Sequence, residues 1–244
     1  MGGALEQRWQ TQNICKEIVT VDPVSSKIKS PRDIPVGFKP QVIVFAVKPQ
    51  SLAEIVKDYK AYAGALVISI AAGKPIAFFE KHLGAAAKIV RSMPNTPASI
   101  GKGITVACAN KNVSGSEKDM ATKLLGAVGE VFWVEKESLL NPVTALSGSG
   151  PAYIFLLIET LTKSGIHIGL DATLAEKLAR QTVIGSAALA EADTSPASEL
   201  RKNVTSPGGT TEAAVKMLVA EPGIQKLFDR ALKAATQRAE ELSG

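Results

Sequence analysis

The sequence contains very little cysteine and histidine. Among its 244 residues there are two cysteines, Cys15 and Cys108, and two histidines, His82 and His167. The isolated cysteines form neither a disulfide framework nor a zinc-binding spacing. Each histidine stands alone, whereas a metal site needs several ligands together. We therefore expect reduced thiols, a cytoplasmic location and no bound metal.

The sequence also lacks long apolar runs and a block of charge of one sign. No uninterrupted apolar segment reaches the ~18 residues needed to span a bilayer, and the opening MGGALEQRWQ lacks the basic start and apolar stretch of a signal peptide. The net charge is +5, but Lys and Arg are interleaved with acids. Because nucleic-acid binding needs clustered basic residues, we expect neither a nucleic-acid nor a membrane partner.

The first part of the chain alternates short apolar runs with helical segments. Leu5 and Trp9 share one face of an opening helix that is predicted to end near Asn13. Apolar strands that alternate with helices predict an α/β fold with a parallel sheet covered on both faces. The predicted strands are 17–22, 42–47, 65–70, 88–93, 105–109 and 130–134. The predicted helices between them are 51–61, 75–82 and 116–127.

The strand signal disappears beyond residue 141. Pro151 suits the first turn of a helix, which we predict to stop at Gly165. A second helix is predicted from Asp171, and a last one carries the apolar stripe Ile224, Leu227, Phe228, Leu232 and Ala235. We expect two domains, with residues 1–140 holding the sheet and residues 141–244 all-α. The all-α domain is predicted to pair with a second copy; the alternative is a monomer with a closed core.

The most informative segment is NVTSPGGTT, residues 203–211, which runs into EAAVKML. Gly208 and Gly209 permit backbone angles and close approaches that are closed to other residues. Thr210 or Thr211 is expected to cap the following helix, whose free N–H groups and positive dipole end suit a small anion. The alternative is an ordinary loop that starts a helix.

Three other segments accompany it: AVKPQ at 46–50, MPNTP at 93–97 and LSGSGPAY at 146–153. In this order and spacing, the four segments resemble the pyrroline-5-carboxylate reductase family, whose members catalyse the last step of proline synthesis. The resemblance covers the whole chain. It implies a Rossmann-like dinucleotide-binding domain followed by a helical dimerisation and substrate-binding domain. It also implies NADPH or NADH as cofactor, and a homodimer or a ring of dimers.

The start of the chain departs from the family pattern. The family has an N-terminal strand that runs into GxGNMGG, and Gly2 and Gly3 match only the tail of this motif. The first strand and the first glycines, which cradle the cofactor pyrophosphate in a Rossmann unit, are absent. We expect the protein to start upstream of Met1, since losing a central strand would leave buried backbone groups unpaired. The alternative is a real truncation.

The resemblance assigns cofactor binding to residues of both halves. Asp22 is expected to end the second strand of the family's domain and to bind the adenosine ribose, which leans toward NAD. The alternative is a turn residue before Pro23, and because Lys27 and Lys29 could bind a 2′-phosphate, the choice of nucleotide stays open. The other implied cofactor-binding residues are Gly2, Gly3, Ala46, Val47, Lys48, Pro49, Ala72 and Asn203.

The resemblance also implies the substrate site and the reaction. Hydride transfer to the C=N carbon of the cyclic imine gives L-proline, with the protein chiefly positioning the reactants. The implied substrate-binding residues are Ser206, Gly208, Gly209, Thr210 and Thr211. Thr211 is the expected catalytic residue, through a hydrogen bond to the imine nitrogen. The family's MPNTP loop borders nicotinamide and substrate, and its site forms where the two halves meet across a dimer.

Two other functions compete with this one. A hydroxyacid-type dehydrogenase would use a catalytic lysine on a helix of its second domain, in a pattern that this sequence does not contain. A non-catalytic, oligomer-forming remnant would have lost cofactor binding together with its first strand.

Overall fold

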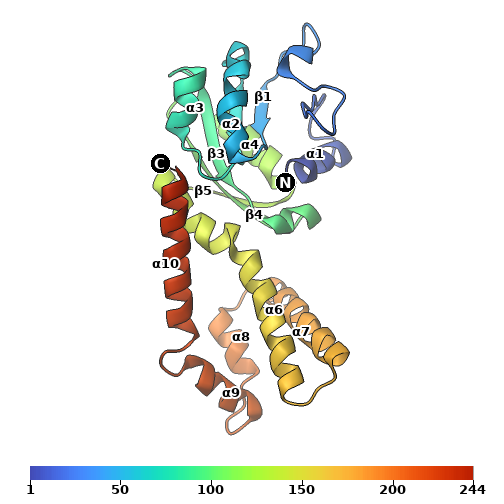
Figure 1. Ribbon diagram of the computed structural model, residues 1–244, viewed down its shortest axis with the longest axis vertical. Coiled ribbons are helices and arrows are strands. Elements are labelled where there is room, and N and C mark those ends of the chain that lie inside the picture. The colour runs from blue at the N-terminus through green and yellow to red at the C-terminus, as the bar shows by residue number, and fades with distance from the viewer. Residues whose placement is uncertain (244) are drawn as a thin grey trace. The chain divides into compact units, whose positions relative to one another are not determined.

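The computed structural model describes residues 1–243 (Figure 1). The chain forms two compact units. The first comprises Met1–Ser149 together with the end of the chain from Ala234, and the second comprises Gly150–Lys233. This division is made by contacts within the chain, and the domain boundary at residue 140 stays a prediction.

The first unit contains a five-stranded sheet with the order β1-β2-β3-β4-β5. Its strands are β1 (Val42–Phe45), β2 (Leu66–Ser69), β3 (Lys88–Met93), β4 (Gly103–Ala109) and β5 (Gly129–Trp133). All pairs are parallel except β3 and β4, which are antiparallel. This pair departs from the expected parallel order because the connection from Met93 to Gly103 is too short for a crossover.

Helices cover both faces of this sheet, as the sequence predicted. In β2, Val67 faces a core that includes helix α3, whereas Leu66 and Ile68 face the opposite core. The first core is covered by α2 (Pro49–Ile55), the 3₁₀-helix η2 (Val56–Tyr62) and α3 (Ile76–Leu83). The second is covered by α1 (Gly2–Thr11) and α4 (Gly115–Gly126). Strict alternation along the strands thus produces a three-layer α/β/α unit.

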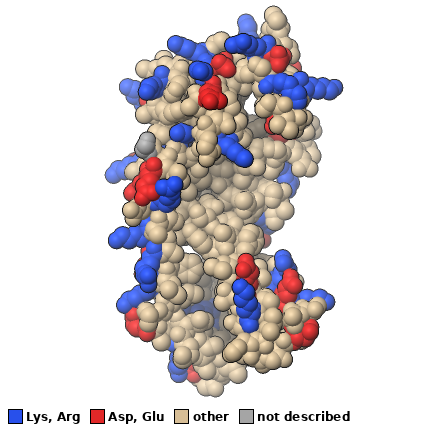
Figure 2. Space-filling view, viewed as in Figure 1, with Lys and Arg blue, Asp and Glu red and all other residues tan. Residues whose placement is uncertain are grey.

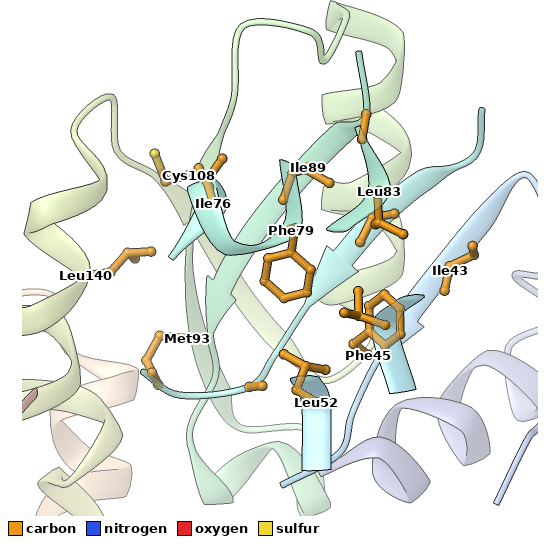
Figure 3. Packing of buried hydrophobic residues seen from close by; sticks show 14 of the residues in the cluster. Ile43, Phe45, Leu52, Ile76, Phe79, Leu83, Ile89, Met93, Cys108 and Leu140 are labelled. Carbon is orange, nitrogen blue, oxygen red and sulfur yellow. The ribbon is translucent and has the colours of Figure 1, made fainter. Parts of the chain in front are cut away.

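Both cores consist mainly of buried aliphatic and aromatic side chains. Figure 3 shows Phe79 of α3 among Ile89, Leu52 and Phe45, and the rings of Phe79 and Phe45 lie 5.9 Å apart. Burying each such side chain contributes about 1.5–3 kcal/mol. On the other face, Trp9 is buried and its indole N–H donates to the carbonyl of Leu124 at 2.7 Å. The predicted opening helix is therefore confirmed.

The strand predicted over 17–22 does not form. The structure gives this segment a single bridge, between Val21 and Ile28. Asp22 lies in a turn, where its carboxylate accepts hydrogen bonds from the amides of Val24 (2.7 Å) and Ser25 (2.9 Å). β-Branched residues favour strands only where a neighbouring strand pairs with them, and within residues 1–243 this segment has no such neighbour.

The first unit also contains several short helical segments. The helix predicted over 51–61 splits into α2 and η2, and the predicted helices 75–82 and 116–127 correspond to α3 and α4. The other segments are η1 (Pro31–Asp33), η3 (Thr96–Ile100), η4 (Glu137–Leu139), α5 (Leu140–Val143) and the π-helix η5 (Thr144–Gly148).

The second unit is entirely helical. It contains α6 (Gly150–His167), α7 (Ala172–Ala192), α8 (Ala197–Asn203), α9 (Thr210–Val219) and the beginning of α10 (Ile224–Ser243). The sequence analysis missed α8. It also ended α6 too early, because the helix continues past Gly165 to His167. A Cβ at Gly165 would lie 3.2 Å from that of Ala175 in α7, so this glycine allows close helix packing rather than ending the helix.

The second unit buries few of its large apolar side chains. Its buried hydrophobic residues are Ala175 and Ala179, whereas Phe155 is 60% exposed and Met217 78% exposed. The charged side chains form no single stripe on the face shown in Figure 2, where basic and acidic residues are interspersed. None of the helices in residues 1–243 combines the length and apolar composition needed to cross a bilayer.

Candidate functional site

Three parallel strands end at the same edge of the sheet, where open α/β sheets bind their ligands. β1, β2 and β3 run in the same direction, so the segments that follow Phe45, Ser69 and Met93 share this edge. The segments after β1 and β2 carry small side chains, which leave room close to the backbone. These two segments contain the predicted cofactor residues Ala46, Val47, Lys48, Pro49 and Ala72.

The N-terminus of α1 lies against the segment that follows β1. A Cβ placed on Gly2 would lie only 2.7 Å from the Cβ of Ala46, so only glycine fits here. A Cβ placed on Gly3, the next residue of α1, would have no neighbour within 4 Å. A helix N-terminus without side chains presents its amides and positive dipole end to a phosphate. This helix N-terminus is therefore suited to a phosphate group.

The segment after β1 turns directly into α2. Lys48 is the N-cap of α2 in an extended conformation, and Pro49 occupies the first helical position, where its missing N–H costs nothing. The side chain of Lys48 is exposed, and Val47 packs against the core beside α3. Lys48 thus adds an exposed positive charge to this edge of the sheet.

The turn after β2 is held tightly. Gly73 has φ +70°, and a Cβ there would lie 2.8 Å from the carbonyl oxygen of Leu242 in the last turn of α10. The Ser69 hydroxyl accepts from the amide of Ala71 at 3.3 Å, and the Ser92 hydroxyl donates to the carbonyl of Ser69 at 3.0 Å. The neighbouring Ala72 is left exposed. The sequence analysis did not predict the contact with Leu242, because the two segments are far apart in the chain.

Asp22 does not end a strand, contrary to expectation. The amides of Val24 and Ser25 bind its carboxylate and hold the pKa of Asp22 below its usual value. The structure therefore uses this carboxylate to stabilise a turn. Its contribution to ribose binding stays a prediction.

The MPNTP loop after β3 is fixed by a side chain that the sequence analysis overlooked. Asn95 accepts a hydrogen bond from the amide of Ile104 at 3.0 Å and donates one to the carbonyl of Ser147 at 3.3 Å. Met93 and Pro94 beside it are buried. Asn95 therefore ties MPNTP to LSGSG within the first unit, whereas the sequence suggested only stiffness from two prolines.

The NVTSPGGTT segment forms a turn between α8 and α9 in the second unit. The amide of Gly209 donates to the carbonyl of Ser206 at 3.0 Å, and Gly208 has φ +72°. Helix α9 begins at Thr210 with Gly209 as its N-cap and without a side-chain cap. The expectation that Thr210 or Thr211 caps the helix is therefore wrong. Instead, the Glu212 carboxylate accepts from the amide of Gly208 at 2.8 Å.

The start of α9 keeps backbone donors available. The first main-chain bond of the helix runs from the amide of Ala213 to the carbonyl of Gly209, at 3.2 Å. The amides of Thr210, Thr211 and Glu212 precede it and have no helical acceptor. Lys216 lies 3.3 Å from Glu212 and offsets its charge. The hydroxyl and amide groups here suit a small carboxylate without an arginine.

The predicted substrate residues therefore lie within one turn. Ser206 and Thr210 are exposed, Gly209 and Thr211 are half-buried, and Asn203 ends α8 just before them. Asn203 shares the second unit with these residues, whereas the other predicted cofactor residues belong to the first.

The sheet edge and the small-residue turns define a Rossmann-like, dinucleotide-binding class of protein with a separate helical unit. Comparison with known proteins specifies the family. Residues 137–242 match the family model described as "Pyrroline-5-carboxylate reductase dimerisation". A curated reductase that is 44% identical over 83% of this chain extends the match to the first unit. The chain therefore belongs to the pyrroline-5-carboxylate reductase family, which confirms the resemblance.

Curated relatives and solved structures agree on this family. The chain is 44% identical over 207 residues to pyrroline-5-carboxylate reductase of Pseudomonas aeruginosa, and the match covers 83% of this chain and 74% of the relative. A reductase structure from Coxiella burnetii is 44% identical with a TM-score of 0.79, covering 84% of this chain and 76% of that one. The Plasmodium falciparum enzyme with NADP bound is 33% identical with a TM-score of 0.74, covering 84% and 78%. These matches favour the reductase over both competing functions.

Proposed function

We propose that this chain reduces 1-pyrroline-5-carboxylate to L-proline with NADH or NADPH, the last step of proline biosynthesis. The observation that carries the proposal is 44% identity to a pyrroline-5-carboxylate reductase over most of the chain. The Plasmodium relative with NADP bound supports a nicotinamide cofactor. The chain is thus an oxidoreductase that acts on a cyclic imine.

The first unit supplies most of the cofactor site in this proposal. When bound, NADH or NADPH supplies the hydride. The amides of Gly2 and Gly3 at the start of α1 hold a phosphate, and Lys48 adds a positive charge nearby. Ala72 leaves space for a flat ring beside the turn after β2. The other residues proposed to contact the cofactor are Asp22, Ala46, Val47, Pro49 and Asn203.

The second unit supplies the substrate site. The Ser206 hydroxyl and the amides of Thr210 and Thr211 bind the substrate carboxylate at the start of α9, where Gly208 and Gly209 let the backbone approach it. The Thr211 hydroxyl donates a hydrogen bond to the ring nitrogen, and solvent is the ultimate proton source. Fixing both reactants in line supplies about 7–11 kcal/mol of barrier reduction without covalent chemistry.

The first test is an optical assay of nucleotide oxidation by the purified chain with pyrroline-5-carboxylate added. Oxidation that depends on the imine supports the proposal, and no turnover with either nucleotide overturns it. Replacing Thr211 by Val removes the hydroxyl and keeps the shape, so kcat is expected to fall by about 10²-fold. Thr211→Ser keeps the hydroxyl and most of the activity. Thr173→Val, at an exposed position of α7, is the matched control and leaves kcat unchanged.

The assembly and location follow as part of the same proposal. The family model for residues 137–242 describes dimerisation, and the exposed apolar residues of the second unit support pairing with a second copy. We propose a homodimer, which a ring of dimers would extend. A cytoplasmic location rests on the isolated thiols Cys15 and Cys108, both of which are free.

A further inference from the structure

Asn95 occupies a position where its side chain replaces a strand partner. The antiparallel register pairs Met93 with Val106. Two residues further along, Asn95 therefore lies opposite Ile104. β3 has ended by then, and the side-chain Oδ1 of Asn95 accepts the Ile104 amide at 3.0 Å in place of a main-chain carbonyl. The side chain thus closes the end of the β3–β4 ladder.

The Nδ2 group of the same side-chain amide binds a different segment of the chain. Asn95 Nδ2 donates to the carbonyl of Ser147 at 3.3 Å, and Ser147 lies in the π-helix η5. In an α-helix, the carbonyl at position 147 would bond to the amide at position 151. That residue is Pro151, which has no N–H. Asn95 Nδ2 therefore supplies the hydrogen-bond donor that Pro151 lacks.

We propose that Asn95 is a positioning residue that fixes the MPNTP loop against the LSGSG segment, residues 146–150, at the end of η5. This inference rests on the proposed reductase function. Because the two hydrogen bonds use opposite ends of one planar amide, a shift of the loop relative to η5 breaks at least one of them. Asn95 holds Pro94 and Thr96 in one register with Ser147, and a displacement of ~1 Å in such a support can reduce a rate by ~10²-fold.

Asn95→Asp tests this inference with the smallest change of shape. The carboxylate still accepts from Ile104 but has no donor for the Ser147 carbonyl. We expect kcat to fall by roughly 10- to 100-fold with the KM values unchanged. Asn112→Asp is the matched control, since Asn112 donates to the carbonyls of Ala85 and Ala87 before β3 begins. The control should keep the parental kcat. An N95D chain with parental kcat would overturn the inference.

Pro151→Ala distinguishes loss of the hydrogen bond to the Ser147 carbonyl from general damage at position 95. The new amide at position 151 gives the Ser147 carbonyl its own donor, so the kcat cost of N95D should be severalfold smaller in the P151A background. Equal costs in both backgrounds contradict the inference. If N95D alone does not fold, the double variant decides: recovery of folding and turnover supports the inference, and failure of both overturns it.

Hydrogen exchange separates the possible failures. N95D should lose protection in peptides that cover Thr144–Gly148, and N112D should not. No turnover by the parent chain overturns the proposed function and the inference with it. Turnover by the parent together with unchanged exchange in N95D overturns the inference alone.

Discussion

Arg91 places a positive charge inside the first unit. Its side chain is 4% exposed, and among the described residues it is the one charged residue that is buried. Its guanidinium donates to Glu137 at 2.8 Å, and the same carboxylate accepts from the amide of Ile76 at the start of α3. Glu137 thus joins β3, α3 and the segment that leads toward LSGSG. A buried charge of this kind depends on its partner.

We predict that Glu137→Ala lowers the free energy of unfolding by about 3 kcal/mol, because it leaves the Arg91 charge and the Ile76 amide unpaired. Denaturant unfolding measures the loss. Glu176→Ala is the control, since Glu176 pairs with Arg180 at an exposed site at 3.6 Å, and it should cost less than about 0.5 kcal/mol.

A companion variant tests the reason for this loss. Replacing both partners, with Arg91→Met and Glu137→Leu, should be less destabilising than Glu137→Ala alone, because no unpaired charge remains. If the double variant is the less stable of the two, the charge is not the cause.

Glu117 makes the free energy of unfolding of the first unit depend on pH in the acid range. Hydrogen bonds from Lys88, 2.6 Å away, and from the amide of Ser114 lower the pKa of Glu117 from 4.5 to about 2. A carboxylate with a depressed folded-state pKa stabilises the protein fully above its unfolded-state pKa, and this stabilisation is lost as pH falls toward the folded-state value. The window is therefore pH 4.5 down to about 2.

We predict that Glu117→Gln removes this contribution. The difference in unfolding midpoint between the parent and E117Q should be largest above pH 5 and should close as the pH approaches 2. Chemical denaturation at several pH values measures it. A difference that stays constant across this range would show that the ion pair with Lys88 does not titrate as the geometry requires.

At the scale of elements, two glycines of the second unit should respond oppositely to the same substitution. Gly208 has φ +72° in the turn before α9, whereas Gly185 lies inside α7 with open space around it. We predict that Gly208→Ala lowers stability by about 1 kcal/mol and raises the KM for the imine, because the turn must shift. Gly185→Ala should raise stability by about 0.5–1 kcal/mol. Thermal melts and steady-state kinetics of both variants provide the comparison.

The sequence predicted those elements that local chemistry determines. β3 was predicted at its observed bounds because it carries the adjacent β-branched residues Ile89 and Val90 and ends on the apolar Met93. Helix α7 begins where the Asp171 side chain caps it, as predicted. The strand over 17–22 failed because pairing depends on a neighbour distant in the sequence. The 3₁₀-helix η2 was read as part of an α-helix, since both have similar helical periodicity.

The residues of the candidate site also differ in how far the sequence predicts them. Gly208 was recognisable from its motif, and the structure gives it the positive φ that only glycine adopts readily. The link from Asn95 to Ser147 was not, because it joins residues 52 positions apart. The cap of α9 was misassigned to Thr210 or Thr211, whereas the Glu212 carboxylate bonds to the amide of Gly208.

At the scale of the whole molecule, the second unit exposes large apolar side chains on several helices. They include Phe155 and Leu156 of α6 and Met217 of α9, each more than half exposed. Large apolar surface left exposed to solvent marks interaction sites. We predict a melting temperature that rises with protein concentration, because association stabilises the folded chain by mass action.

Phe155→Asp should weaken this association and lower the melting temperature. Sedimentation velocity measures the shift toward the monomer. Val36→Asp, at a fully exposed position of the first unit, is the control and should leave the assembly unchanged. An F155D chain with the parental mass at every concentration would exclude α6 from the interface.

Helix α10 begins in one compact unit and ends in the other, since the first unit resumes at Ala234. The second unit is thus inserted within the first, and Leu242 covers the turn at Gly73. During synthesis, the strands of the sheet are made before the second unit, but the sheet lacks this contact until α10 has been made. Folding of the first unit should therefore finish only after the second unit has been synthesised, even though domains generally fold in order from the N-terminus.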